Sequence, residues 1–312
     1  MENGTSVKKN KLQASRRKDA IFCSLILAYP LLHFAIFYIY VNFSSFAMAF
    51  QYYYDGEYIF DWGKQNLDQI IYDFKNLPIM VSGLKNSAIV YFCSMLIGEP
   101  LAILFSYCIY KKIKGTKFFK IILFMPTIIP GLVLCLIYKY FVDDAIPEIM
   151  YLFFKKEMLG LLTTASTMFG TVLFYTLFMG FGPKVLVYSS TMSGINESIV
   201  ESAQLDGISF ARELVSITIP MIFATITTYI VASIATFVTN QMNLFNFFAH
   251  DALPSISTFG YYLYVKTQIA SVNGSYGDFT YVSALGFMFS LVVVPLTILV
   301  KKLLEKYGPS EN

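Results

Sequence analysis

Six apolar stretches with few or no charged residues divide the chain. Each is close to or longer than the roughly 20 residues that a helix needs to cross about 30 Å of hydrocarbon. A helix is the expected form because a spanning segment must satisfy its own backbone hydrogen bonds. The predicted spans are residues 20–46, 86–110, 118–141, 161–188, 217–248 and 281–303. The sequence therefore predicts an all-α integral membrane protein with about six transmembrane helices.

Prolines and one carboxylate interrupt these runs. Pro126 and Pro130 lie within the third run and predict a break or kink there. Glu99, followed by Pro100, lies near the middle of the second run. A carboxylate at that depth costs a few kcal/mol on insertion scales, about 2.5–3.5 kcal/mol for an acidic side chain at the helix centre. We therefore expect Glu99 to face the interior of the helix bundle or water.

Composition supports a lipid environment. Hydrophobic residues make up 56% of the 312 residues and charged residues only 14%, whereas soluble domains carry about 25% charged residues. The net charge of +3 is too small to indicate a nucleic-acid partner. The four cysteines lie in apolar runs without CxxC spacing, and the two histidines are far apart, so no metal site is expected.

The distribution of charge predicts the orientation. Most of the 23 Lys and Arg residues lie in the tail at 1–19, in the 111–120 loop and near the C-terminal tail at 304–312. The positive-inside rule places these segments in the cytoplasm. Both termini would then be cytoplasmic, which requires an even number of spans. Residues 47–84 and 249–280 become the outer loops.

The segment 189–216 is too polar to cross a membrane, and the predicted orientation makes it cytoplasmic. Ile195, Ile199 and Ala203 recur every four residues and predict a short amphipathic helix with acidic residues on its other faces. Asp206-Gly207 is a stop and turn signal because glycine accepts a positive φ at a helix end. A second helix would then run to Pro220. A helical pair in a loop between two spans is interpreted as a docking element.

This loop contains a motif whose residues and spacing together form a recognisable pattern. Glu201-Ser-Ala-Gln-Leu-Asp-Gly207 is followed, after nine residues, by Ile217-Thr-Ile-Pro220. This resembles the EAA loop of binding-protein-dependent ABC transporter permeases, whose pattern is E-A-A, three residues, G, nine residues, I-x-L-P. Ser202 and Ile219 depart from that pattern conservatively. Pro254-Ser-Ile-Ser-Thr258, a Y-Y-L-Y stretch and Ser-Ala-Leu at 283–285 resemble one permease type of sugar importers, although the usual Gly-Gly-Pro is missing.

The resemblance implies a type I ABC importer permease fold in a bacterial cytoplasmic membrane. The implied partners are an ATP-binding subunit dimer, a second homologous permease, an extracytoplasmic solute-binding protein and the lipid bilayer. No phosphate-binding G-x-x-x-x-G-K-[ST] motif is found, so we expect ATP hydrolysis on a separate chain. The resemblance implies that ATP and Mg belong to the partner ATPase, that this chain binds no cofactor and that it is a transport subunit, not an enzyme. In this interpretation Glu201 contacts the ATPase, Ala203 allows close approach and Gly207 permits the turn. The implied coupling residues are Glu197, Glu201, Ala203, Asp206, Gly207 and Pro220.

The substrate path is predicted from polar residues in the spans. Glu99 is either a hydrogen-bond acceptor for sugar hydroxyls, a gating contact, or a carboxyl satisfied by a neighbouring helix. In the fifth run, polar and aromatic residues recur at i, i+4, i+7 and i+11, so they form one stripe if the helix is continuous. Such a stripe could bind neutral polyols through its amides, or form hydrogen bonds to neighbouring helices. That stripe is Thr236, Asn240, Asn243 and Phe247.

Four functions are open to a membrane protein with these features. The first is a permease for a sugar or oligosaccharide, and the second is the same machinery carrying a solute such as a glycerol phosphate ester. A phosphate cargo would favour basic residues along the path, and none is evident in the middle of a span. The third, a polytopic membrane enzyme, would need a catalytic cluster, and Asp143-Asp144 is the only adjacent acidic pair. A passive channel would not explain the docking loop.

Overall fold

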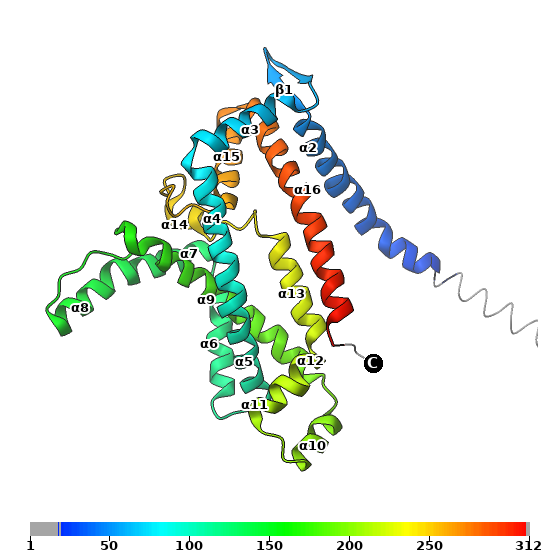
Figure 1. Ribbon diagram of the computed structural model, residues 1–312, viewed down its shortest axis with the longest axis vertical. Coiled ribbons are helices and arrows are strands. Elements are labelled where there is room, and N and C mark those ends of the chain that lie inside the picture. The colour runs from blue at the N-terminus through cyan, green and yellow to red at the C-terminus, as the bar shows by residue number, and fades with distance from the viewer. Residues whose placement is uncertain (1–17, 19, 310–312) are drawn as a thin grey trace, which may run out of the picture. The chain divides into compact units, whose positions relative to one another are not determined.

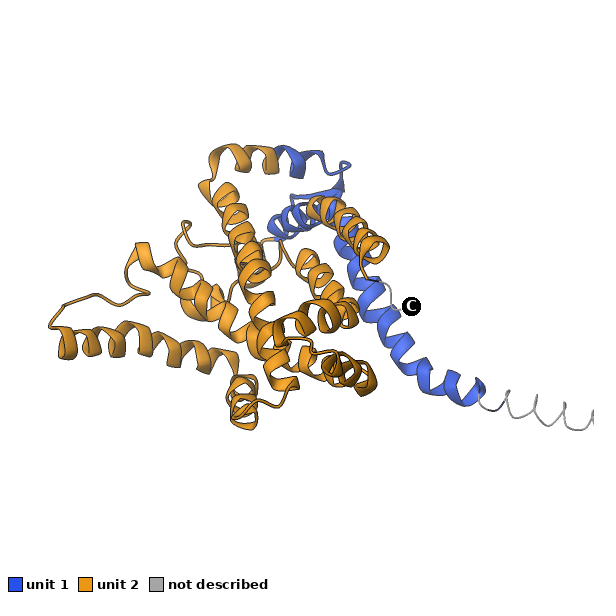
Figure 2. Cartoon of the chain, turned by 60° about the horizontal axis from the view of Figure 1, so that its bottom comes forward, with its two compact units in different colours: residues 1–68, 276–287 blue, residues 69–275, 288–312 orange. Residues whose placement is uncertain are grey.

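The computed structural model describes residue 18 and residues 20–309, and these are helical over most of their length (Figure 1). The chain divides into two units, one of residues 1–68 with 276–287 and one of residues 69–275 with 288–312 (Figure 2). Apart from Lys18, the predicted basic tail at 1–19 lies outside the described residues. The same holds for residues 310–312 of the predicted C-terminal tail.

The first unit begins with a helix over Ala20–Ala49, whose last segments are η1 (Phe34–Tyr40) and α2 (Val41–Ala49). A β-hairpin follows, formed by β1 (Gln51–Tyr54) and β2 (Glu57–Phe60). Asp55 and Gly56 form its two-residue turn, with φ of 47° and 90°, as expected for a turn in which both residues need positive φ. The helical class is confirmed, and this hairpin is an addition that the all-α prediction missed.

The second unit contains most of the helices. Helix α9 (Ala165–Ser193) packs against α5 (Glu99–Tyr110) and α6 (Thr116–Ile128), and α15 (Phe259–Asn273) packs against α4 (Pro78–Cys93) (Figure 1). Helices α3 (Lys64–Asn76) and α16 (Tyr276–Tyr307) have residues in both units. The elements of the second unit are α4 (Pro78–Cys93), η2 (Ser94–Gly98), α5 (Glu99–Tyr110), α6 (Thr116–Ile128), α7 (Gly131–Tyr140), η3 (Phe141–Ala145), α8 (Ile146–Phe154), α9 (Ala165–Ser193), α10 (Glu197–Leu205), α11 (Phe210–Glu213), η4 (Leu214–Thr218), α12 (Ile219–Met221), α13 (Phe223–Ala235), α14 (Leu244–Phe248) and α15 (Phe259–Asn273).

Four helices among the described residues are long and apolar enough to cross a membrane: Ala20–Ala49, Pro78–Tyr110, Ala165–Ser193 and Tyr276–Tyr307. Two bent pairs raise the number to six if each pair is counted as one span. Thr116–Ile128 and Gly131–Phe154 meet at 108°, and Phe210–Met221 and Phe223–Ala235 meet at 70°. The break predicted near Pro130 is confirmed, because α6 ends at Ile128 and Pro130 precedes α7.

The fifth predicted span, a continuous helix over 217–248, is wrong. Helix α13 ends at Ala235, and α14 begins only at Leu244. Polar side chains in between bond to nearby backbone: the Asn240 carboxamide oxygen accepts from Met242 N at 2.9 Å. Met242 and Asn243 adopt positive φ of 55° and 56°. Asparagine competes with helix formation in this way, and apolarity alone did not reveal it.

Three π-helical segments end two residues before a proline. Segments η2, η3 and η4 are followed by Pro100, Pro147 and Pro220 respectively. A proline has no N–H and its ring collides with the carbonyl one turn back, so the local ladder cannot stay regular. Here the residue before each proline donates its N–H to the carbonyl five residues earlier, for example Glu99 N to Ser94 O. The helices thus continue through their prolines with one widened turn.

The segment 249–258 is fastened to α4. The Asn86 amide group donates to Ser255 O and Ser257 O, both at 2.9 Å, and Phe259 N donates to Ser87 Oγ at 3.1 Å. On its other side, Gly260 lies so close to the 236–243 segment that a Cβ there would be 2.4 Å from Thr239 C and 2.7 Å from Asn240 N. Only glycine fits this contact between backbones.

Gly260→Ala is therefore expected to destabilise the protein by about 1–3 kcal/mol, as overpacking of a rigid contact does. The measurement is the melting temperature of the purified protein in lipid nanodiscs. Gly170→Ala is the matched control, because a Cβ at Gly170 in α9 meets no atom within 4 Å. Equal melting temperatures for the two variants would contradict the close contact.

Candidate functional site

The polar loop after α9 folds as a helical pair. Asn196 caps α10, its side-chain oxygen accepting from Ser198 N at 3.1 Å. The helix ends at Leu205, and Gly207 has a φ of 75°. The N–H of Ile208 then donates to Ala203 O at 3.1 Å, which satisfies a carbonyl at the helix end. The predicted helix and glycine turn are both present in the structure.

The predicted coupling residues largely face outward. Glu197, Glu201, Asp206 and Gly207 are exposed, whereas Ala203 is half-buried and Pro220 lies in α12. Leu205, at the end of α10, is 90% exposed. A short helix that presents an apolar tip beside three carboxylates has the form of a surface that another protein could cover.

The loop is anchored from behind by apolar contacts. Ile195 and Val200 are buried and belong to a core cluster with residues of α5 and α9. The Tyr107 ring of α5 lies against the Phe210 ring at 4.6 Å between centroids, and Tyr107 OH donates to Phe210 O at 3.2 Å. The start of the second helix of the pair is therefore held on α5.

An ion pair adds a second anchor. Lys111 Nζ lies 2.5 Å from Glu213 Oε1, and Glu213 is only 3% exposed. Sequence reasoning missed both roles: it counted Lys111 among the loop charges that set orientation and did not single out Glu213. The available signal was a glutamate on the apolar side of α11, where an unpaired charge would be costly.

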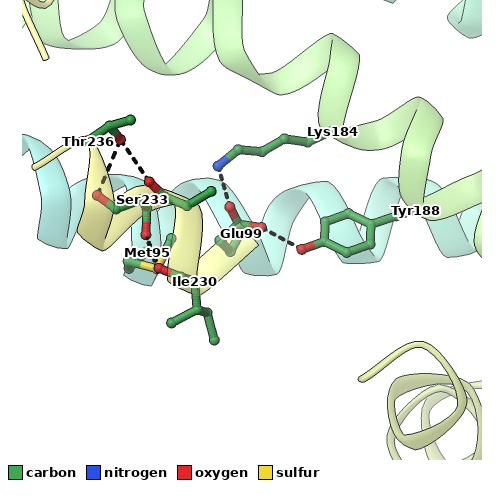
Figure 3. Close-up of polar contacts among 8 residues, drawn as sticks. Met95, Glu99, Lys184, Tyr188, Ile230, Ser233 and Thr236 are labelled. Carbon is green, nitrogen blue, oxygen red and sulfur yellow. Dashed lines mark hydrogen bonds and ion pairs between the residues drawn. The ribbon is translucent and has the colours of Figure 1, made fainter. Parts of the chain in front are cut away.

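Glu99 belongs to the predicted substrate path, and its side chain binds two side chains of α9. It begins α5, is 5% exposed, and forms an ion pair with Lys184. Its other oxygen accepts from Tyr188 OH at 2.9 Å. Lys184 and Tyr188 are four residues apart and therefore on one face of α9, as Figure 3 shows. Of the alternatives left open for Glu99, the structure shows a carboxyl satisfied by a neighbouring helix.

A cavity of about 260 Å³ lies beside this pair. Its lining combines hydroxyl, amide and aromatic side chains from α4, η2, α9, α13 and the 236–240 segment. Figure 3 shows Ser233 and Thr236 of this wall near the Glu99 cluster. The lining residues are Ser87, Val90, Tyr91, Ser94, Lys184, Tyr229, Ala232, Ser233, Thr236, Phe237 and Asn240.

The predicted stripe on the fifth run is split by the end of α13. Thr236 and Asn240 line the cavity, whereas Asn243 and Phe247 do not. Phe247 is 7% exposed and packs at 4.9 Å from the Tyr175 ring in a hydrophobic core. The prediction that these four residues form a single polar and aromatic face is wrong, because they do not lie on one helix.

Sequence reasoning missed most of the opposite wall. Ser87, Tyr91 and Ser94 follow at i, i+4 and i+7 in the second run, which is a detectable helical spacing. Lys184 was assigned to the loop charges, but it lies inside α9, nine residues before Ser193. The expectation that no basic residue lies in the middle of a span therefore needs correction at Lys184, which lies well inside α9.

Comparison with known proteins gives the family. Residues 98–307 match the model of the binding-protein-dependent transport system inner membrane component. The chain belongs to this family. The match covers α5 to α16, and it includes both the helical pair and the cluster formed by Glu99, Lys184 and Tyr188. The chain is thus a multi-pass component of the inner membrane and a transport subunit rather than an enzyme.

Individual relatives are distant. The multiple sugar-binding transport system permease protein MsmF of Streptococcus mutans is 23% identical over 69% of this chain and 72% of its own length. The galactooligosaccharides transport system permease protein GanP of Bacillus subtilis is 25% identical over 60% of this chain and 46% of its own length. The chain therefore spans less than half of GanP.

Solved structures confirm the fold. A chain of a bacterial ABC transporter involved in the import of the acidic polysaccharide alginate superposes with a TM-score of 0.74 at 17% identity, covering 95% of this chain and 99% of that one. The same type of transporter, in complex with an alginate pentasaccharide-bound periplasmic protein, gives a TM-score of 0.72 at 16% identity, covering 94% and 96%.

Removing one partner of the Lys111–Glu213 pair is expected to cost about 3–5 kcal/mol, because it leaves a buried charge without its counterion. Lys111→Met should lower the melting temperature in nanodiscs, and the double variant Lys111→Met, Glu213→Leu should recover most of the loss. The exposed pair Lys301–Glu305, at 3.7 Å, offers a control in Lys301→Met. An equal effect of the two single variants would contradict the anchoring role.

Proposed function

We propose that this permease moves a sugar or oligosaccharide across the membrane by alternating access, driven by a separate ATPase. The single observation that carries the proposal is the 260 Å³ cavity, whose wall offers hydroxyls, amides and aromatic rings. Hydroxyl and amide groups donate and accept hydrogen bonds, as sugar hydroxyls require. Relatives named for the transport of multiple sugars and of galactooligosaccharides support the same solute class.

The partners are proposed from the family and from the loop. An ATP-binding subunit dimer, which holds ATP and Mg, would receive α10 in a groove. Glu201 would contact its surface, and Leu205 would be covered. A second homologous permease completes the pore, and an extracytoplasmic solute-binding protein delivers the sugar. A periplasmic protein is present in one of the similar transporter structures, which supports this last partner.

The proposed orientation follows from charge. Both termini and the helical pair at 189–216 lie in the cytoplasm of a bacterial cell, and the hairpin and the 249–258 segment lie outside. Closure of the ATPase dimer would move α10, and the spans would then rock as rigid bodies to expose the cavity to either side.

The alternative of a phosphate ester gains one supporting observation, the presence of Lys184 at the cavity. Its positive charge is already paired with Glu99, so the site as a whole favours neutral cargo. The enzyme alternative gains nothing from Asp143, because its carboxylate accepts from Leu162 N at 2.8 Å and fastens the start of the α9 segment.

Gly207→Pro and Glu201→Lys are expected to abolish ATP-coupled uptake while the protein still inserts. Proline cannot adopt the φ of 75° at Gly207, and lysine reverses a charge on the exposed face of α10. The measurement is solute uptake and solute-stimulated ATPase activity of the full complex in proteoliposomes. Normal transport by both variants would count against coupling through this loop.

Thr236→Val should raise KM for uptake by about fivefold, because it removes a hydrogen bond to the solute worth about 1 kcal/mol and leaves the shape of the cavity unchanged. Thr239→Val is the matched control: Thr239 is also exposed and also donates to backbone, but it does not line the cavity. If the two variants gave the same KM, the cavity would not be the solute site.

A further inference from the structure

The cavity has one charged lining residue among those that the structure describes. Lys184 supplies it, and the other lining residues are apolar, hydroxyl or amide side chains. An unneutralised ammonium in the wall of this cavity would attract anionic solutes, because opposite charges at contact distance attract one another. The net charge that a solute meets here depends on what surrounds Lys184.

The counterion comes from behind the cavity wall. Glu99 does not line the cavity and is 5% exposed, yet it forms an ion pair with Lys184. Tyr188 OH donates to its second oxygen at 2.9 Å, so both carboxylate oxygens are occupied. The Lys184 ammonium also lies 5.7 Å from the centroid of the Tyr229 ring. A lysine held in this way still has protons to donate towards the cavity.

We infer that Glu99 sets the charge selectivity of the solute cavity by neutralising Lys184 from outside it. The pair then presents ammonium hydrogen-bond donors without net charge, which suits the hydroxyl and ring oxygens of neutral sugars. Acidic sugars gain little, because the attraction of Lys184 for their carboxylates is offset by Glu99. The inference rests on the proposed function, since it takes the cavity to be the solute site.

The decisive test compares two disaccharides that differ only at C6, where the hydroxymethyl groups of α-1,4-galactobiose are replaced by carboxylates in α-1,4-digalacturonate. The dissociation constant of each is measured by calorimetry on the assembled transporter in nanodiscs without its solute-binding protein, so that only the membrane cavity is titrated. The wild-type complex should prefer galactobiose. Glu99→Gln should shift the ratio of the two Kd values towards digalacturonate by at least about tenfold, which corresponds to about 1.4 kcal/mol.

A double-variant cycle separates charge from folding. In Glu99→Gln, Lys184→Gln both charges are absent, and the ratio should return to within about threefold of the wild-type value. Glu305→Gln is the matched control, since it removes a carboxylate from the exposed Lys301–Glu305 pair, and it should leave the ratio unchanged. Melting temperatures of all variants show which of them are folded, and the double variant keeps the test usable if Glu99→Gln is unstable.

Each outcome decides between the proposals. Galactobiose binding with a Kd ratio that Glu99→Gln does not change would overturn the charge inference and leave the proposed sugar site standing. If Glu99→Gln is unstable, a double variant that binds digalacturonate at least about tenfold better than the wild type does would also overturn it. Failure of both sugars to bind the wild type and every folded variant would overturn the sugar site, and the inference with it.

Discussion

A helix in hydrocarbon must pair every backbone N–H and C=O with a partner inside the protein. Departures from a regular helix are therefore costly in the spans of this chain, and three of those that occur lie beside candidate site residues. Glu99 follows the widened turn η2 directly. The second helix of the pair at 189–216 joins its span through η4 and Pro220. The cavity wall at Thr236 and Asn240 begins where α13 ends.

Buried charged side chains, like buried backbone groups, need partners inside the protein. Lone charges in apolar surroundings are expensive, and each buried acid of this unit that carries a role has a lysine partner on a different element. Glu99 of α5 is paired with Lys184 of α9, and Glu213 of α11 is paired with Lys111 at the end of α5. These pairs join helices that are distant in sequence. They fix which helix faces meet, which apolar packing alone specifies less strictly.

The sequence predicted the features that depend on local chemistry. The α10 helix was predicted from apolar periodicity, the turn at Gly207 from a glycine stop signal and the break at Pro130 from proline, and the structure shows all three. Features that depend on distant partners were missed. Nothing near Lys184 in sequence indicates Glu99, and hydropathy could not show that α13 ends at Ala235, inside an apolar run and before Asn240 and Asn243. The Asp55-Gly56 hairpin was detectable from its turn residues, but it was overlooked among the aromatic residues.

Helix α5 carries two attachments on one rigid segment. Tyr107 holds Phe210 near one end, and Glu99 holds α9 eight residues earlier, about 12 Å away along the axis at 1.5 Å per residue. A rigid rod fixed at two points transmits displacement from one to the other. If a partner pulls the loop by its Phe210 end, either the Tyr107 contact must break or the Glu99–Lys184 pair beside the cavity must move with the loop.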